Sequence, residues 1–319
     1  MSSEPPPLPI RSAEFEAGGL NSRGLRHLAA KGTMARVVPG SYINGLTWKA
    51  LDKRERYALR VREHMARVSP RLVASHWSAA ALWGMPVIDS WPAETQVTDP
   101  SRSTSSRTPA LLRRPGAVPD VELVRVDGIL VTSAVRTAVD LALAEGFETG
   151  VVLFDHGLHA KMYTREQLER CLESRTRARR HRAATRALEF ASGDAQYPGE
   201  SFSRIGMAAR GFPTPILQQT FFDAQGKLFA DFWWPAHGIA GEFDGNWKYS
   251  DPRFLRGRTA TQAVIDEKRR QNRLEAHPEV RRVVRWDYPV ARDPDQLARR
   301  LLAGGLPRLD PRRRQPRNA

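Results

Sequence analysis

Acidic residues in the stretch 198–268 have the types and positions that metal-dependent chemistry requires. Glu200 follows a Pro-Gly pair that can open a helix, while Asp231 and Glu242 each interrupt a short apolar run. A carboxylate inside a strand is costly to bury without a partner. Carboxylate oxygens bind hard divalent cations. Such a cation, with the point charge of a lysine such as Lys248, can stabilise the transition state of phosphodiester hydrolysis.

The spacing also predicts the local structure that would aim these acids at one place. Residues 228–234 and 239–243 read as two strands, and the turn at 235–238 predicts a hairpin between them. Alternate residues of a strand face the same side, so we expect Glu242 and Asp244 to share a face.

These motifs resemble the PD-(D/E)XK nuclease superfamily, and most closely its Vsr-like branch, in a form often found at the C-terminal end of actinobacterial proteins. The matching residues are Glu200 in Pro-Gly-Glu-Ser, Asp231 in Asp-Phe-Trp-Trp-Pro, Glu242, Asp244 and Gly245 in Glu-Phe-Asp-Gly, Lys248-Tyr249, and the helix Glu267-Lys268-Arg269-Arg270. The resemblance implies a restriction-endonuclease-like mixed sheet flanked by helices. It also implies that Asp231 and Glu242 hold Mg²⁺ or Mn²⁺, with Glu200 as a further ligand.

The sequence departs from that superfamily in one important place. The usual lysine two residues after the second acid is Asp244 here. Lys248 would have to supply the positive charge, with Asp244 as an assisting group or ligand. Gln271 and Asn272 stand where related sequences tend to carry acids. These departures keep open an alternative in which the nuclease-like domain is catalytically inactive.

Near the N-terminus, the pattern predicts a winged helix-turn-helix. It consists of helices at 11–17 and 21–31, the second capped by Asn21 or Ser22, and a hairpin at 34–43 that turns at Pro39-Gly40. The second helix would enter the major groove of DNA. The candidate DNA-binding residues are Arg23, Arg26, His27 and Arg36.

This segment resembles the N-terminal domain of AbiEi-type antitoxins. The matching residues are Leu25-Arg26-x-Leu28, Gly32, Arg36-Val37 and Pro39-Gly40-x-Tyr42, and the stretches 76–80 and 131–141 resemble the middle of the same family. The resemblance implies a DNA-binding regulator that has a cognate toxin as a partner. A winged helix can also serve as a protein–protein module, and that alternative stays open.

The pattern indicates an α/β fold, α+β overall, in several parts. We expect a disordered start at 1–9, the winged helix at 10–46, a mostly helical middle at 47–191, the PD-(D/E)XK-like domain at 192–306 and a basic disordered tail at 307–319. In the middle part, the sequence predicts helices at 51–68, 73–84, 150–160 and 164–174, one from Thr132 or Ser133, a loop at 101–109 and a hairpin around Asp127-Gly128. Arg136 and Asp140 are four apart on one helix and are expected to pair.

Composition favours a nucleic-acid partner. The 319 residues include 50 Lys and Arg against 35 Asp and Glu, a formal charge of +15 that attracts polyanions such as double-stranded DNA. The single cysteine, Cys171, excludes a disulfide within the chain and suits a reducing cytoplasm. We find no apolar run of membrane-spanning length and no secretory signal pattern, so we expect a cytoplasmic protein without membrane contact.

The sequence therefore predicts a DNA-binding protein with a Mg²⁺-dependent endonuclease domain. The alternative is an antitoxin-like transcriptional regulator with an inactive nuclease-like domain. A third interpretation, a protein-interaction scaffold, would require no salt-dependent affinity for nucleic acid.

Overall fold

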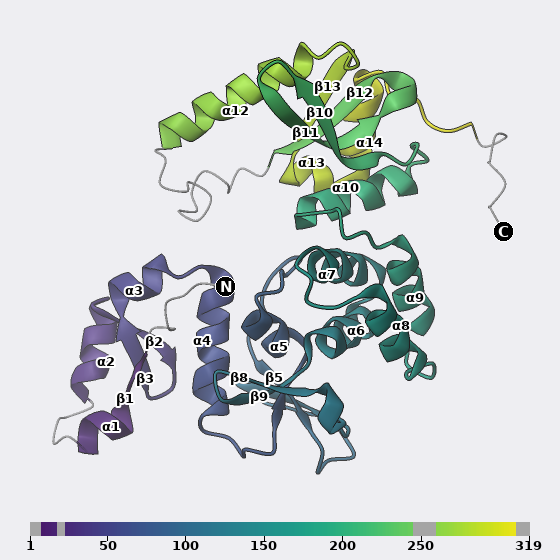
Figure 1. Cartoon of the computed structure of the whole chain (residues 1–319). Coiled ribbons are helices and arrows are strands. Elements are labelled where there is room, and N and C mark those ends of the chain that lie inside the picture. Colours follow the sequence, from purple (N-terminus) through teal and green to yellow (C-terminus); the bar gives the residue numbers. More distant parts are fainter. Residues whose placement is uncertain (1–7, 18–22, 245–259, 311–319) are drawn as a thin grey trace. The chain divides into compact units, whose positions relative to one another are not determined.

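The computed structural model describes residues 8–17, 23–244 and 260–310, and only the helical backbone of residues 260–267. The chain divides into two compact units. Unit 1 comprises Met1–Leu153 and Lys161–Glu189, and unit 2 comprises Phe154–Ala160 and Phe190–Ala319. Both units combine helices with a sheet, so the fold is α+β as predicted (Figure 1). The ends predicted to be disordered lie largely outside the described residues, which begin at Leu8 and end at Asp310.

The described part of unit 1 opens with a small sheet and three helices. The elements are β1 (Ile10–Arg11), α1 (Ser12–Ala17), α2 (Arg23–Ala30), β2 (Met34–Val38), β3 (Ser41–Asn44) and α3 (Gly45–Ala50). The sheet order is β1-β3-β2, and β2 and β3 form the predicted hairpin. Gly40 turns the chain with a φ of 74°, which favours glycine. The predicted helix caps Asn21 and Ser22 lie outside the described residues.

The middle of the chain contains a six-stranded sheet, so the expectation of a mostly helical domain was incomplete. The sheet order is β6-β7-β5-β4-β9-β8. The strands are β4 (Val73–Ala74), β5 (Thr95–Asp99), β6 (Ser106–Arg107), β7 (Leu111–Pro115), β8 (Leu123–Val126) and β9 (Ile129–Thr132), with a 3₁₀ turn at Asp120–Glu122. Residues 73–74 were expected to begin a helix, but they pair with β5 and β9. Similarly, β6 lies inside the predicted loop.

Six helices accompany these strands, and α4, α6 and α8 each begin at a residue whose side chain caps the helix. They are α4 (Lys53–Met65), α5 (His76–Trp83), α6 (Ala134–Glu145), α7 (Phe147–His159), α8 (Arg165–Glu173) and α9 (His181–Phe190). The predicted cap Ser133 accepts a hydrogen bond from the Arg136 backbone N–H. Asp127 and Gly128 both have positive φ in the predicted hairpin turn. The Arg136–Asp140 pair forms at 2.7 Å, and Glu122 and Arg175 join it.

Unit 2 is built on a mixed four-stranded sheet in the order β10-β11-β12-β13. Its elements are α10 (Pro198–Ala209), β10 (Ile216–Asp223), β11 (Gly226–Trp234), a 3₁₀ turn (Pro235–His237), β12 (Ile239–Asp244), α12 (Ala260–Glu275), β13 (Arg282–Asp287), α13 (Tyr288–Arg292) and α14 (Pro294–Ala303). β11 and β12 form the predicted antiparallel hairpin, while β12 and β13 are parallel. The long connection between the parallel strands contains α12.

Helices cover both faces of this sheet (Figure 1). On one face, Leu274 of α12 packs against Leu228, Ala230 and Trp233. On the other, the Trp286 Nε1–H donates to Ser203 Oγ of α10 at 2.7 Å. Trp234 is also buried. Trp233 and Trp234 are therefore core residues.

A segment of α7 is part of unit 2 because its buried Asp155 is bound there. The carboxylate accepts hydrogen bonds from the Ser192 backbone N–H at 2.7 Å, from Ser201 Oγ at 2.7 Å and from the Arg204 guanidinium at 2.8 Å. Asp155 is only 1% exposed, and a buried charge requires such partners.

The glycine of the Pro-Gly-Glu motif is a packing requirement. A Cβ atom on Gly199 would lie 1.9 Å from Cζ of Phe243, so the phenyl ring covers this position of α10 directly. The contact fixes the first turn of α10 against β12, and it thereby places Glu200 near the strand that carries Glu242.

We expect Gly199→Ala to lower the free energy of unfolding by about 1–3 kcal/mol, because the added methyl group overpacks the Phe243 ring. Gly206→Ala is the matched control in the same helix. Its Cβ would lie 3.2 Å from the tip of Leu297 and at ordinary contact distance from Pro294, and the higher helix propensity of alanine offsets the crowding. Denaturant unfolding of both variants measures the difference, and equal effects would contradict this account.

Candidate functional site

Three elements of unit 2 place the predicted acids. Glu200 lies in the first turn of α10, Asp231 lies in β11 and Glu242 lies in β12. Glu200 is 2% exposed and Glu242 is 1% exposed, whereas Asp231 is half-buried. Glu200 and Glu242 are therefore shielded from solvent, and Asp231 is partly shielded. The groups that are hydrogen-bonded to these carboxylates determine what else they can bind.

Gln218 of β10 links two of these acids. Its Nε2 donates to Glu200 Oε2 and to Asp231 Oδ1, each at 3.3 Å. Gln196 donates in turn to Gln218 Oε1 at 3.0 Å, which orients the amide. Gln218 has a φ of 48°, which is uncommon for a residue other than glycine. Sequence reasoning missed Gln218. The available signal was an amide pair, Gln218-Gln219, within a strand that is otherwise largely apolar.

Asp231 is turned toward β12. Its Oδ2 accepts a hydrogen bond from the Phe243 backbone N–H at 2.8 Å. Ala230 and Trp233 belong to the same core cluster, although residues three apart in a regular strand face opposite sides. The alternation of β11 therefore shifts around Asp231, which brings this carboxylate beside the residue that follows Glu242.

Glu242 is held by arginine. Arg270 of α12 donates to Oε1 at 3.1 Å and to Oε2 at 2.6 Å, and also to the Phe229 carbonyl at 2.9 Å. Arg285 of β13 approaches Oε2 at 3.5 Å. Burial raises the pKa of Glu242 to about 7, Arg270 and Arg285 oppose the rise, and the nearby charge of Asp231 adds to it. Neither arginine was predicted as a partner, because contact between a helix and a strand depends on tertiary packing.

The other predicted residues are less closely involved in this cluster. Asp244 ends β12 and is half-buried. Lys268 is exposed on α12. Lys248, the predicted source of positive charge, lies outside the described residues, as do Gly245 and Tyr249. The structure thus gathers Glu200, Asp231 and Glu242 and gives no position for the lysine.

The three acids suit a hard divalent cation, since the atoms with which they would bind a metal are all carboxylate oxygens. Within the part of the chain that the structure describes, however, no group of three or more His, Cys, Asp or Glu side chains is arranged to hold a metal ion. Both oxygens of Glu242 are bound by Arg270. Glu242 could therefore act as a metal ligand only after it exchanged this partner.

The candidate DNA-binding residues lie in the N-terminal part of unit 1. Arg23, Arg26 and His27 have exposed side chains on α2, and Arg36 is exposed on β2. Leu25 is buried beneath the helix. The arrangement leaves these polar side chains of α2 on its solvent side.

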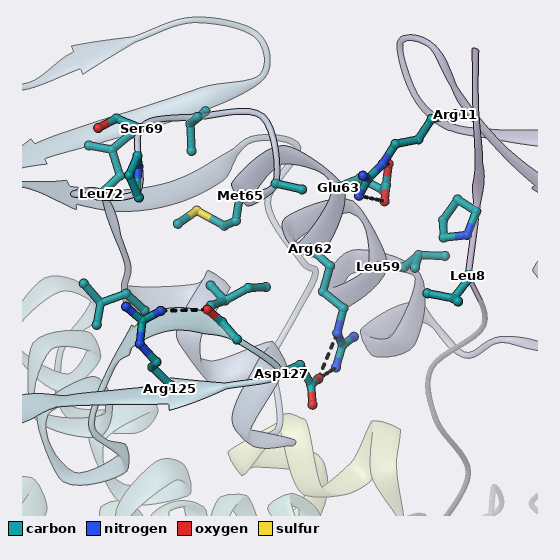
Figure 2. A pocket seen from close by; sticks show the side chains of 17 residues that line it. Leu8, Arg11, Leu59, Arg62, Glu63, Met65, Ser69, Leu72, Arg125 and Asp127 are labelled. Carbon is teal, nitrogen blue, oxygen red and sulfur yellow. Dashed lines mark hydrogen bonds and ion pairs between the residues drawn. The ribbon is translucent and has the colours of Figure 1, made fainter. Parts of the chain in front are cut away.

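Unit 1 also contains a cavity of about 630 Å³ beside α4 (Figure 2). Its acids are bound by arginine: Arg62 pairs with Asp127 at 2.7 Å, and Arg11 pairs with Glu63 at 3.1 Å. Figure 2 shows both pairs at the wall of the cavity, between apolar side chains such as Leu59. These pairs connect the N-terminal strand and the β8–β9 turn to α4, so we assign the cavity walls a structural role.

Comparisons with known proteins give two mycobacterial relatives. The uncharacterized proteins MT2308 and Rv2248, from the CDC 1551 / Oshkosh and H37Rv strains of Mycobacterium tuberculosis, are each 30% identical to this chain over 139 residues. The matched region covers 43% of this chain, and the chain spans about half (51%) of the length of these relatives. No protein-family model matches the chain. Among the described helices, none combines the length and apolarity needed to cross a membrane.

We expect Asp231→Ala to lower the free energy of unfolding by about 1–3 kcal/mol, because the buried Phe243 N–H loses its acceptor. Asp231→Asn retains an acceptor oxygen and should cost clearly less. Denaturant unfolding of the full chain distinguishes the two. If both variants were as stable as the wild type, the Asp231–Phe243 hydrogen bond would not support the site. Asp231→Asn is therefore the better variant for functional assays.

Proposed function

We propose that this chain is a DNA-binding protein and that unit 2 hydrolyses phosphodiester bonds with a divalent cation, as an endonuclease of the PD-(D/E)XK type. The observation that carries the proposal is the contact among the acids: Gln218 binds Glu200 and Asp231, and Asp231 binds the backbone of the residue that follows Glu242. Two buried carboxylates and a half-buried one that lie near each other lower the stability of the fold, so stability does not explain their presence. Such a cluster is therefore a candidate functional site.

Each residue has a role in this proposal. Asp231 and Glu242 would hold Mg²⁺ or Mn²⁺, with Glu200 as a further ligand. When bound, the cation would stabilise the charge of the transition state and activate water. Gln218 orients Glu200 and Asp231 through its two hydrogen bonds. Lys248 would bind the attacked phosphate, and Asp244 would assist as a ligand or a neighbouring hydrogen-bond acceptor.

Unit 1 would provide the affinity for duplex DNA. Helices α1 and α2 and the β2–β3 hairpin follow the order that the winged helix-turn-helix pattern predicts, and β1, which was not predicted, pairs with β3. Exposed Arg26 and His27 on α2 suit a helix that enters the major groove. The overall charge of +15 would attract DNA to both units.

We expect the wild-type chain to cut supercoiled DNA in the presence of Mg²⁺ or Mn²⁺ and to stop on addition of EDTA. Asp231→Asn and Glu242→Gln should each reduce cutting by about 100-fold or more, because each removes an anionic ligand. Arg273→Gln is the control, since Arg273 pairs with Asp223 at 2.5 Å, apart from the acids. Cutting that persists in both acid variants would contradict the proposal.

A second candidate function is an antitoxin-like transcriptional regulator whose nuclease-like unit is inactive and which has a toxin as a partner. Two observations favour it. Arg270 binds both oxygens of Glu242, and Asp244 stands where the superfamily carries lysine. In this account unit 1 binds an operator, and unit 2 contacts DNA without cutting it.

Both candidates place DNA binding on α2 and on the β2–β3 hairpin. We expect Arg26→Gln and Arg36→Gln to weaken duplex binding and to reduce the slope of log K against log salt by about one for each phosphate contact that is lost. Arg71→Gln, another exposed arginine of unit 1, is the control. Fluorescence anisotropy over a series of salt concentrations measures both quantities. An unchanged slope in the Arg26 and Arg36 variants would exclude these side chains from the interface.

A further inference from the structure

We propose that Arg270 acts as a built-in cation at the acidic cluster of unit 2, so that its guanidinium and a divalent metal ion compete for Glu242. The inference rests on the proposed function, because it concerns the same cluster. It assigns a positioning role to a residue that the sequence motifs did not single out for it.

Arg270 binds Glu242 through two hydrogen bonds, and we call this arrangement the clamp. The two terminal nitrogens of its guanidinium each meet one oxygen of Glu242, at 3.1 Å and 2.6 Å. Nη1 also donates to the Phe229 carbonyl of β11 at 2.9 Å. Paired hydrogen bonds between a guanidinium and a carboxylate are among the strong ones in proteins. The clamp thus uses both oxygens with which Glu242 would bind a metal.

Arg270 can leave this position more readily than Glu242 can. The Arg270 side chain is 34% exposed, whereas that of Glu242 is 1% exposed. A guanidinium at the surface can exchange its carboxylate for water without burying an unpaired donor. The buried carboxylate cannot turn to water, so a cation beside it is what stabilises its ionised form.

The charges of the cluster favour a divalent cation once the guanidinium withdraws. Glu200, Asp231 and Glu242 are three acids, and Arg270 and Arg285 are two cations, so the ionised set has one excess negative charge. Withdrawal of Arg270 raises the excess to two, which equals the charge of Mg²⁺. The same step frees the oxygens that complete a ligand set with Asp231.

Arg285 makes this exchange feasible. Its Nη2 lies 3.5 Å from Glu242 Oε2, and its Nε and Nη2 are buried without a hydrogen-bond partner among the described residues. These two nitrogens form the edge of a guanidinium that can bind a carboxylate bidentately. Arg285 therefore keeps a positive charge beside Glu242 while Arg270 is displaced.

The test is metal binding by the full chain without DNA, measured by calorimetry with Mn²⁺ and with Mg²⁺. We expect Arg270→Gln to bind the metal about tenfold more tightly than the wild type, because a charge-assisted competitor is removed. Arg270→Lys keeps a charge but loses the paired geometry, so it should show a smaller gain. Arg273→Gln, one turn further along α12, should leave the affinity unchanged.

Further variants and assays decide the interpretation. Adding Glu242→Gln to Arg270→Gln should abolish the gain in affinity, since the freed carboxylate is the ligand. The competition would be overturned if folded Arg270→Gln bound the metal no more tightly than the wild type. It would also be overturned if none of the variants bound the metal. If Arg270→Gln failed to fold, judged by circular dichroism, an unchanged affinity in folded Arg270→Lys would overturn it.

DNA cutting by the wild type separates this inference from the proposed function. Cutting without any gain in metal affinity in Arg270→Gln would retain the nuclease and reject the competition. Tighter metal binding without cutting by any variant would retain the competition and reject hydrolysis.

Discussion

Burial of the Glu242 carboxylate constrains the whole of unit 2. A charge that is 1% exposed must be compensated. The compensation comes from α12 through Arg270 and from β13 through Arg285. Helix α12 is thereby tied to the face of the sheet on which Leu274 packs. The charge pair and the apolar packing of Leu274 together hold the connection between the two parallel strands against the sheet.

A similar dependence links the two short motifs that carry the acids. The ring of Phe243 fits against the Cα of Gly199, and the Phe243 backbone N–H binds Asp231. Phe243 therefore contacts both α10 and β11, although it carries no ionisable group. The acids converge because an apolar residue between Glu242 and Asp244 fixes the distance between a helix and a hairpin.

The sequence was sufficient for features whose cause is local. The β11–β12 hairpin, the start of α10 at Pro198, the Asp127-Gly128 turn and the Arg136–Asp140 pair all follow from residues close together in the chain. In the six-stranded sheet of unit 1, strands β4 to β7 were missed because they are very short or read as polar. β5, for example, buries Thr95, Gln96, Thr98 and Asp99. Propensity and periodicity carry little signal in such strands.

For the candidate site, the acids were recognisable but their partners were not. Gln218, Arg270 and Arg285 lie far from the acids in sequence, and their contacts depend on strand register and on the placement of α12. The predicted lysine lies outside the described residues, and the cations that the structure shows beside Glu242 are arginines from α12 and β13. Patterns of charge along a helix, such as Lys268 to Arg270, do not distinguish solvated residues from one that binds a buried acid.

The Asp155 contacts have a consequence for how this protein could be rearranged. Unit 2 is not a contiguous stretch of chain, because it includes Phe154–Ala160 as well as everything from Phe190 onward. A gene fragment that begins at Phe190 would encode Arg204 and Ser201 without the carboxylate that binds them. Recombination at a single junction therefore cannot transfer this unit intact to another protein. Transfer would have to include α7, which carries Asp155, together with the segment Lys161–Glu189 of unit 1.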